Sequence, residues 1–99
     1  MSEKKLPPIH PGEILLEEFL RPMEITPYRL SRALGVDPRR IHAVIHGQRA
    51  ITPDTALRLS RFFRLSEQFW MNLQARYDLE IEKSRHGEEI EKIEEFEMA

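Results

Sequence analysis

The chain has 99 residues, of which 40% are hydrophobic and 32% are charged, and its formal net charge is −2. This length fits one domain with a modest core, and this balance is typical of a soluble helical protein rather than a disordered one. The absence of cysteine excludes disulfides and cysteine-based zinc sites, which fits a cytoplasmic protein. No apolar run is long enough to span a bilayer and the N-terminus has no signal-peptide core, so we expect no membrane partner.

The charges are segregated along the chain. Residues 25–64 hold eight Arg against two Asp, a local balance of +6, whereas residues 80–99 hold eight Glu against three basic residues, a balance of −5. A basic middle suits a polyanion, and an acidic end suits solvent or a basic partner. On charge alone, the alternative that both segments are ordinary solvated faces stays open.

The first predicted helix follows a flexible arm at residues 1–8. The sequence His10-Pro-Gly-Glu13 places proline in the first helical turn, where its missing N–H costs nothing. Pro22 should end the helix, because the residue before a proline avoids helical angles. The buried face of this helix is expected to consist of Ile14, Leu15, Phe19 and Leu20.

Three later helices share one start signal, a short capping side chain followed by proline. The three pairs are Thr26-Pro27, Asp37-Pro38 and Thr52-Pro53. Glycines in the left-handed conformation should end the first two of these helices, at Gly35 and Gly47. Residues 30–47 are therefore predicted to form two short helices joined tightly, a helix-turn-helix whose second helix is built to enter a DNA major groove.

The fourth helix is predicted to end near residue 63, and Ser66 can cap a fifth. The fourth should bury some combination of Ala56, Leu57, Leu59, Phe62 and Phe63. The apolar stripe of the fifth consists of Phe69, Trp70, Leu73, Tyr77 and Ile81. Five of the eight aromatic residues fall in residues 62–77. We expect most of these rings to form a core, with a leftover part of the fifth helix available for a symmetric dimer.

After Ile81 the helical pattern weakens. Ile90, Ile93 and Phe96 recur at roughly three-residue spacing in a charged stretch that follows Gly87. A short amphipathic helix and a disordered tail that folds on a partner both remain open. The chain shows no strand signal and no repeat, so it predicts an all-α fold with a DNA-binding domain at 9–82 and an acidic extension at 83–99.

The second helix of the motif supplies candidates for reading DNA. Its apolar residues Ile41, Val44 and Ile45 should face the core, so the outward residues are Pro38, Arg39, Arg40, His42, Ala43 and His46. Such helices turn their N-terminal part toward base edges, which favours Arg39, His42 and Ala43. Arginine can bond O6 and N7 of guanine, and an alanine methyl can meet a thymine methyl. Arg40 would do the same as Arg39 or hold a phosphate.

Four further residues are candidates for holding the phosphate backbone. Thr26 and Tyr28 stand at the positive end of the second helix, where hydroxyl and backbone N–H groups can bond a phosphate oxygen. Gln48 and Arg49 follow Gly47 and can contact the adjacent backbone. The alternative is that all four are ordinary polar surface residues.

His42 and His46 also stand four residues apart, a spacing that can chelate zinc, so a metal-dependent enzyme is a remote alternative. Neither a glutamate between them nor a cysteine completes such a site. The sequence has no phosphate loop, nucleophile elbow or paired-carboxylate pattern. We therefore expect no enzymatic activity, no cofactor and no small-molecule substrate.

Four segments resemble the HigA family of antitoxins, also labelled virulence-associated protein I, within the Xre/Cro-like helix-turn-helix group. They are Ile9-His-Pro-Gly-Glu-Ile-Leu15, the helix-turn-helix with Arg39-Arg-Ile41, Ile51-Thr-Pro-Asp-Thr-Ala-Leu-Arg-Leu59 and Phe69-Trp-Met-Asn-Leu-Gln-Ala-Arg-Tyr-Asp-Leu79. The resemblance covers about residues 6–82. One departure is Ser31, where the motif usually has alanine; its hydroxyl can bond back along the helix.

The resemblance implies a five-helix Cro/repressor-like (lambda repressor-like) fold and a homodimer that binds operator DNA and represses its own operon. It also implies a HigB-type toxin partner, an mRNA-cleaving ribonuclease. Such toxins are basic, so the acidic extension fits one. A stand-alone Xre-family regulator without a toxin partner is the alternative.

Overall fold

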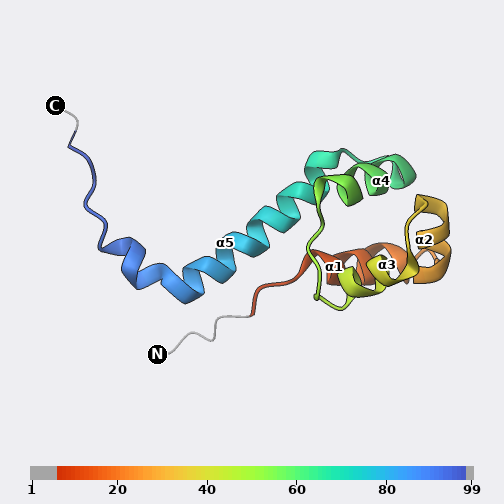
Figure 1. Cartoon of the computed structure of the whole chain (residues 1–99), viewed down its shortest axis with the longest axis horizontal. Helices are drawn as coiled ribbons and strands as arrows, with labels where there is room; N and C mark the ends of the chain where they lie inside the picture. Colours follow the sequence, from red (N-terminus) through yellow and green to blue (C-terminus); the bar gives the residue numbers. More distant parts are fainter. Residues whose placement is uncertain (1–6, 98–99) are drawn as a thin grey trace.

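The computed structural model describes residues 7–97, whose regular structure is helical (Figure 1). The elements are α1 (Pro11–Ile14), its direct π-helical continuation η1 (Leu15–Leu20), α2 (Pro27–Leu34), α3 (Pro38–Ile45), α4 (Pro53–Phe63) and α5 (Glu67–Glu91). With α1 and η1 counted as one helix, the five-helix prediction is confirmed for these residues. Most of the predicted N-terminal arm, residues 1–6, lies outside the described range.

A side chain caps the start of each helix, and the sequence predicts this for all of them except the first, whose cap is His10. The oxygen or nitrogen of the capping side chain accepts a hydrogen bond from a backbone N–H of the first turn, which would otherwise have no partner. The capping residues are His10, Thr26, Asp37, Thr52 and Ser66. Gly35 and Gly47, which follow α2 and α3, have positive φ angles of 71° and 73°. Glycine adopts this conformation without the Cβ clash of other residues, so it can end both helices.

The core lies between the short helices and the first half of α5. Its buried hydrophobic side chains are Leu15, Leu20, Leu30, Leu34, Ile41, Val44, Ile51, Ala56, Leu59 and Trp70. The Phe19 ring packs against Phe63 and Trp70, each with 5.0 Å between ring centroids, and against Phe69 at 6.0 Å. Most of the aromatic cluster is therefore core, as expected.

Two side chains of α4 do not join this core. Leu57 is 55% exposed and Phe62 is 37% exposed, so the buried combination that the sequence left open excludes both. Ala56, Leu59 and Phe63 already supply the face of α4 that packs on the core. Leu57 and Phe62 instead border a surface groove that also touches the end of α2.

Helix α5 is longer than the sequence predicts. It continues through Gly87 to Glu91 as one helix of 25 residues, in place of a separate short helix or a disordered tail. Its buried residues, Trp70 and Gln74, both lie in the first half, and the second half extends away from the other helices (Figure 1). No break in the helix marks residue 82, so the division at 82/83 stays a prediction.

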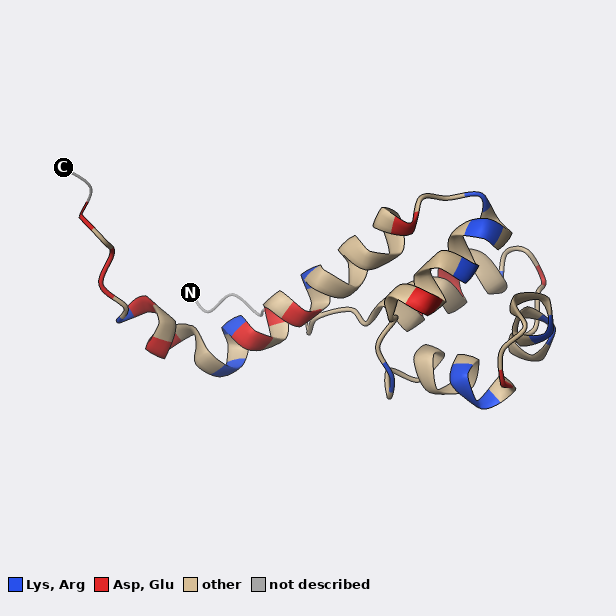
Figure 2. Ribbon diagram, turned by 45° about the horizontal axis from the view of Figure 1, so that its top comes forward, with Lys and Arg blue, Asp and Glu red and all other residues tan. Residues whose placement is uncertain are grey.

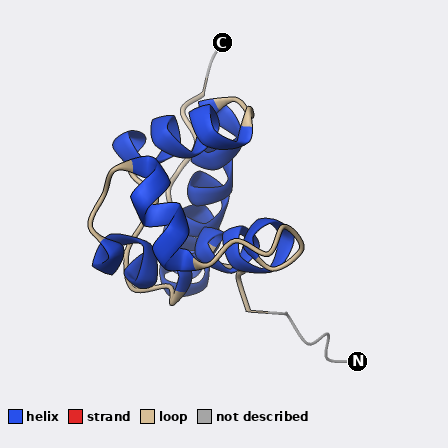
Figure 3. Cartoon of the chain, turned by 90° about the vertical axis from the view of Figure 1, so that its right-hand side faces the viewer, coloured by secondary structure: helices blue, strands red, loops and turns tan. Residues whose placement is uncertain are grey.

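The charges separate in space as they do in sequence. Arginines gather on α2, α3 and α4, whereas acidic residues dominate the far half of α5 and the segment after it (Figure 2). In residues 7–97 the chain forms helices and loops only, with no strand (Figure 3). None of the helices described is both long and apolar enough to cross a membrane.

Ser31 is fully buried in α2 and behaves as the sequence suggests. Its hydroxyl donates a hydrogen bond of 2.6 Å to the backbone carbonyl oxygen of Tyr28. This bond satisfies the buried hydroxyl, so serine replaces a small apolar residue without leaving a polar group unpaired.

Gly12 brings the backbone of α1 directly against the backbone of α3. A Cβ atom at Gly12 would stand 1.8 Å from the carbonyl oxygen of Val44 and 2.5 Å from its carbonyl carbon. Both distances are far inside van der Waals contact. A side chain at position 12 would therefore push α1 away from α3.

We expect Gly12→Ala to lower the free energy of unfolding by at least ~1–3 kcal/mol, the usual cost of overpacking a closed contact. Urea denaturation followed by circular dichroism measures this change. Gly87→Ala is the matched control, because its Cβ has no atom within 4 Å and alanine favours a helix interior; it should stabilise the protein by ~0.5–1 kcal/mol. Unchanged stability of Gly12→Ala would contradict the close contact.

Candidate nucleic-acid interface

One face of α3 is open to solvent along its length. Arg39, His42, Ala43 and His46 follow the spacing i, i+3, i+4, i+7, which places them on the same side of a helix. The Arg39 side chain is 92% exposed, both histidines are exposed and Ala43 is half-buried. Ile41 and Val44 are fully buried on the opposite side. The predicted orientation of this helix is thus confirmed, with Pro38 half-buried in its first turn.

Arg39 is paired with the residue that caps its own helix. Its Nε and Nη2 atoms donate to the two carboxylate oxygens of Asp37, at 3.2 and 2.9 Å. The backbone N–H of Arg39 also donates to Asp37 Oδ1 at 2.8 Å. Hydrogen bonds from the Arg39 side chain, then from its backbone, lower the pKa of Asp37 to about 2. Asp37 therefore stays ionised and holds the guanidinium at the start of α3.

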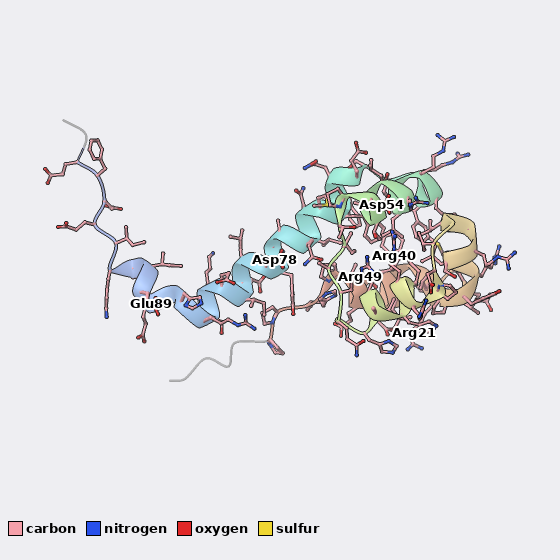
Figure 4. All side chains as sticks on the ribbon, in the orientation of Figure 1. Arg21, Arg40, Arg49, Asp54, Asp78 and Glu89 are labelled. Atoms are coloured by element: carbon pink, nitrogen blue, oxygen red, sulfur yellow. The ribbon has the colours of Figure 1, made fainter. Side chains whose placement is uncertain are left out.

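Arg40 points elsewhere. The sequence places it on the outward face with Arg39, but its side chain is only 25% exposed and pairs with Asp54 at the start of α4 (Figure 4). Because Asp54 in the first turn of α4 lies within reach of the Arg40 guanidinium, Arg40 is turned toward a carboxylate and not outward. The expectation of a fully outward Arg40 is corrected here, and its contact with DNA stays a prediction.

Asp54 links Arg40 to a second arginine that sequence reasoning missed. Its Oδ2 also accepts from Arg58 Nε at 3.0 Å, and Arg58 Nη1 donates to the carbonyl oxygen of Leu34 at 2.7 Å. Hydrogen bonds from Arg40, then from Arg58, lower the pKa of Asp54. This network joins α3, α4 and the last residue of α2. The four-residue spacing of Asp54 and Arg58 was the available sequence signal.

The start of α2 presents hydroxyl groups. Thr26 Oγ1 accepts from the backbone N–H of Arg29 at 3.1 Å, and its own hydrogen remains available to donate. Tyr28 is 55% exposed, and its hydroxyl oxygen accepts from Arg32 Nη1 at 3.2 Å. Arg32 is a further basic group that sequence reasoning missed, although it stands four residues from Tyr28 on the same face.

The loop after α3 carries the remaining candidates. Gln48 and Arg49 are both exposed, and Arg49 lies in the loop between α3 and α4 (Figure 4). The Gly47 N–H bonds the Val44 carbonyl oxygen at 3.0 Å and the Gln48 N–H bonds that of Ala43 at 2.8 Å. These bonds close the end of α3 and fix where the loop begins.

The histidine pair forms no evident metal site. The His42 and His46 rings are nearly parallel with 6.1 Å between centroids, and His46 Nδ1 lies 2.7 Å from the backbone oxygen of His42. Among residues 7–97, no group of three or more His, Cys, Asp or Glu side chains could hold a metal ion. The described structure gives the metal-enzyme alternative no support.

Comparison with known proteins matches this geometry to one group. Residues 16–70 match the family model described as helix-turn-helix. The chain is 49% identical to virulence-associated protein I of Dichelobacter nodosus, over 81% of this chain and 74% of that protein. It is 35% identical to antitoxin HigA-1 of Vibrio cholerae, over 90% of this chain and 84% of that protein.

A solved structure gives the same result. The Pseudomonas aeruginosa antitoxin HigA with the higBA promoter superposes with a TM-score of 0.87 at 45% identity, covering 91% of this chain and 99% of that chain. The chain belongs to the HigA family of helix-turn-helix antitoxins. The resemblance seen in the sequence is thereby confirmed, as is the repressor-like fold that it implies. Among the curated relatives, that of Vibrio cholerae is named an antitoxin and that of Escherichia coli an HTH-type transcriptional regulator, and the solved HigA is described with its higBA promoter.

The ion pair between Arg39 and Asp37 can be tested by titrating the Asp37 carboxyl group. We expect Arg39→Gln to raise the pKa of Asp37 from about 2 toward its ordinary value, because the largest cause of the shift is removed. The carboxyl carbon chemical shift of Asp37, followed by NMR against pH, measures this. Because folding lowers the pKa of Asp37, the ion pair stabilises the folded protein at pH values above the ordinary pKa of an aspartate. This stabilisation is lost as the pH falls toward 2 and Asp37 becomes protonated. Arg40→Gln is the control that should leave the Asp37 titration unchanged.

Proposed function

We propose that this protein is an antitoxin of a type II toxin-antitoxin system, which binds operator DNA as a homodimer, represses its own operon and neutralises a HigB-type mRNA-cleaving toxin. The observation that carries the DNA-binding part is the exposed face of α3, which presents Arg39, His42, Ala43 and His46 on a helix anchored by its opposite face. A recognition helix held this way can enter a major groove without unfolding the core.

The proposed contacts divide into two kinds. Arg39, His42 and Ala43 would face base edges, because they occupy the N-terminal and central part of the open face. Thr26, Tyr28, Gln48 and Arg49 would hold phosphates on either side of the groove, and His46 and Pro38 would border the contact. Arg40 would reach a phosphate if it exchanged Asp54 for it. Phosphate contacts would position the helix, and base contacts would select the sequence.

Operator selection favours a homodimer. One α3 of eight residues reaches only a few base pairs, so two copies related by a two-fold axis would read two half-sites of a palindrome about one helical turn apart. The solved HigA of Pseudomonas aeruginosa bound to promoter DNA supports this assignment. We place this activity in the cytoplasm, on the nucleoid, and assign the protein no catalysis.

The toxin part of the proposal rests on the family and on charge. Relatives over most of this chain are named antitoxins, and the exposed end of α5 carries the Glu-rich segment of the protein. An acidic surface complements a basic toxin and would speed their association. A stand-alone regulator would keep the same DNA interface and lack this partner.

We expect Arg39→Ala to weaken operator binding by ~1–3 kcal/mol and to relax discrimination at one base position. Fluorescence anisotropy on promoter and scrambled DNA at fixed salt measures both effects. Arg21→Ala is a matched control, because Arg21 is also an exposed arginine paired with a carboxylate, Glu17, but lies outside α2 and α3. Equal affinity of the wild type for promoter and scrambled DNA would exclude specific readout.

Co-expression tests the toxin assignment. We expect this protein to restore growth of cells that express the small neighbouring reading frame, and to co-purify with its product as a stable complex. Size-exclusion chromatography measures the complex, and an empty vector is the control. A genome with no toxin-like frame beside this gene would favour the stand-alone regulator and leave the DNA-binding proposal standing.

A further inference from the structure

A groove lies between the end of α2 and the outer face of α4. Its volume is ≈ 650 Å³, and Leu57 and Phe62, the two exposed apolar residues of α4, line it together with Arg58, Arg61 and Arg64. Arg58 is occupied by Asp54 and the Leu34 carbonyl. Arg61 and Arg64 are exposed and form no ion pair within residues 7–97. The groove thus combines two exposed apolar side chains with two exposed arginines, beside the paired Asp54 and Arg58.

The segment after α5 has the opposite character. Residues 93–97 read Ile-Glu-Glu-Phe-Glu, and they are non-helical and exposed. Phe96 is 87% exposed and Ile93 is 68% exposed, and three glutamates flank them. An exposed aromatic anchor within a run of carboxylates complements a groove with exposed apolar side chains and exposed arginines, both in apolar surface and in charge.

The segment cannot fill the groove of its own chain. The groove ends at Arg64, beside the start of α5, whereas the segment follows the end of α5 (Figure 1). A helix of 25 residues is about 37 Å long at 1.5 Å per residue. Residues 92–97 span roughly 20 Å when fully extended, which is too short to return along α5.

A second copy brings the two surfaces together. Leu79 is 59% exposed and stands at the middle of α5, twelve residues from each end. Two α5 helices packed antiparallel through Leu79 would place the end of each helix beside the start of the other. A symmetric contact of this kind repeats the same interaction twice. Each segment 93–97 would then arrive at its partner's α4–α5 corner, where Phe62 and Arg64 lie.

We propose that residues 93–97 of one copy dock in the α2–α4 groove of a second copy, with Phe96 against Leu57 and Phe62 and the glutamates facing Arg61 and Arg64. This inference rests on the homodimer of the proposed function and names its contact surface. It also gives a role to the two α4 side chains that the core leaves exposed. The exchanged segments tie each α5 to its partner's helix-turn-helix.

A charge-exchange experiment tests the contact. Sedimentation equilibrium of the full-length protein without DNA gives the dimer dissociation constant. Arg61→Glu with Arg64→Glu should raise it about tenfold, and Glu94→Arg with Glu97→Arg should do the same. Combining all four changes should return the constant to within about threefold of the wild type. Phe96→Ala should also raise it about tenfold, because the aromatic anchor is lost.

The control replaces two exposed arginines that do not line the groove, Arg21→Glu with Arg49→Glu, and should leave the dimer constant unchanged. The proposal would be overturned if the variant that carries all four charge changes dimerised as weakly as the two double variants. Normal dimerisation of the Arg61→Glu, Arg64→Glu variant would also overturn the proposal. If that variant lost operator or toxin binding instead, the groove would serve that other partner. Wild-type protein that dimerises in this way but binds no operator would instead refute the proposed function alone.

Discussion

The backbone contact between Gly12 and the carbonyl of Val44 decides where the recognition helix lies. Because no side chain separates them, the backbone of α1 at Gly12 lies directly against that of α3 at Val44, and the buried face of α3 is held from that side. Asp54 constrains the other flank through Arg40, and Arg58 ties the same network to the end of α2. With both flanks held, only the face of Arg39 and His42 is free to meet a ligand.

Arg39 and Arg40 are paired with carboxylates in the absence of any ligand, and the usual strength of such ion pairs shows what the pairing does. An exposed ion pair contributes only ~0–1 kcal/mol, because water screens it and holding two side chains costs entropy. If Arg39 contacts DNA as proposed, exchanging Asp37 for a base or phosphate would cost it little, and release of counterions from DNA would favour the exchange. The Asp37 carboxylate orients the Arg39 guanidinium, and in the proposed function it would weaken nonspecific attraction of Arg39 to other polyanions. We therefore expect the Arg39–Asp37 pair to affect which ligand Arg39 selects more than how tightly the protein binds DNA.

Features set by neighbouring residues could be predicted from the sequence, and features set by distant ones could not. The caps at Thr26 and Asp37 each depend on a backbone N–H two or three residues away, so a short motif specifies them. The exposure of Leu57 depends on which face of α4 meets the core, which the apolar pattern leaves ambiguous. Arg40 was misplaced because its partner, Asp54, lies on the next helix. The extension of α5 beyond Ile81 was missed because that part packs against none of the other helices in residues 7–97. It therefore needs no continuous apolar stripe by which a helix could be predicted.

Helix α5 connects the two ends of the molecule mechanically. Its first half is anchored by Trp70 and by Gln74, whose Oε1 accepts from the backbone N–H of Ile51 at 2.8 Å while its Nε2 donates to Asp78 at 2.9 Å. Ile51 lies in the loop between α3 and α4 that also carries Gln48 and Arg49, so the buried amide links α5 to the side of the molecule proposed to face DNA. In the proposed dimer, a partner that holds two α5 helices in one geometry would also set the spacing of the two α3 helices, on which the reading of both half-sites depends.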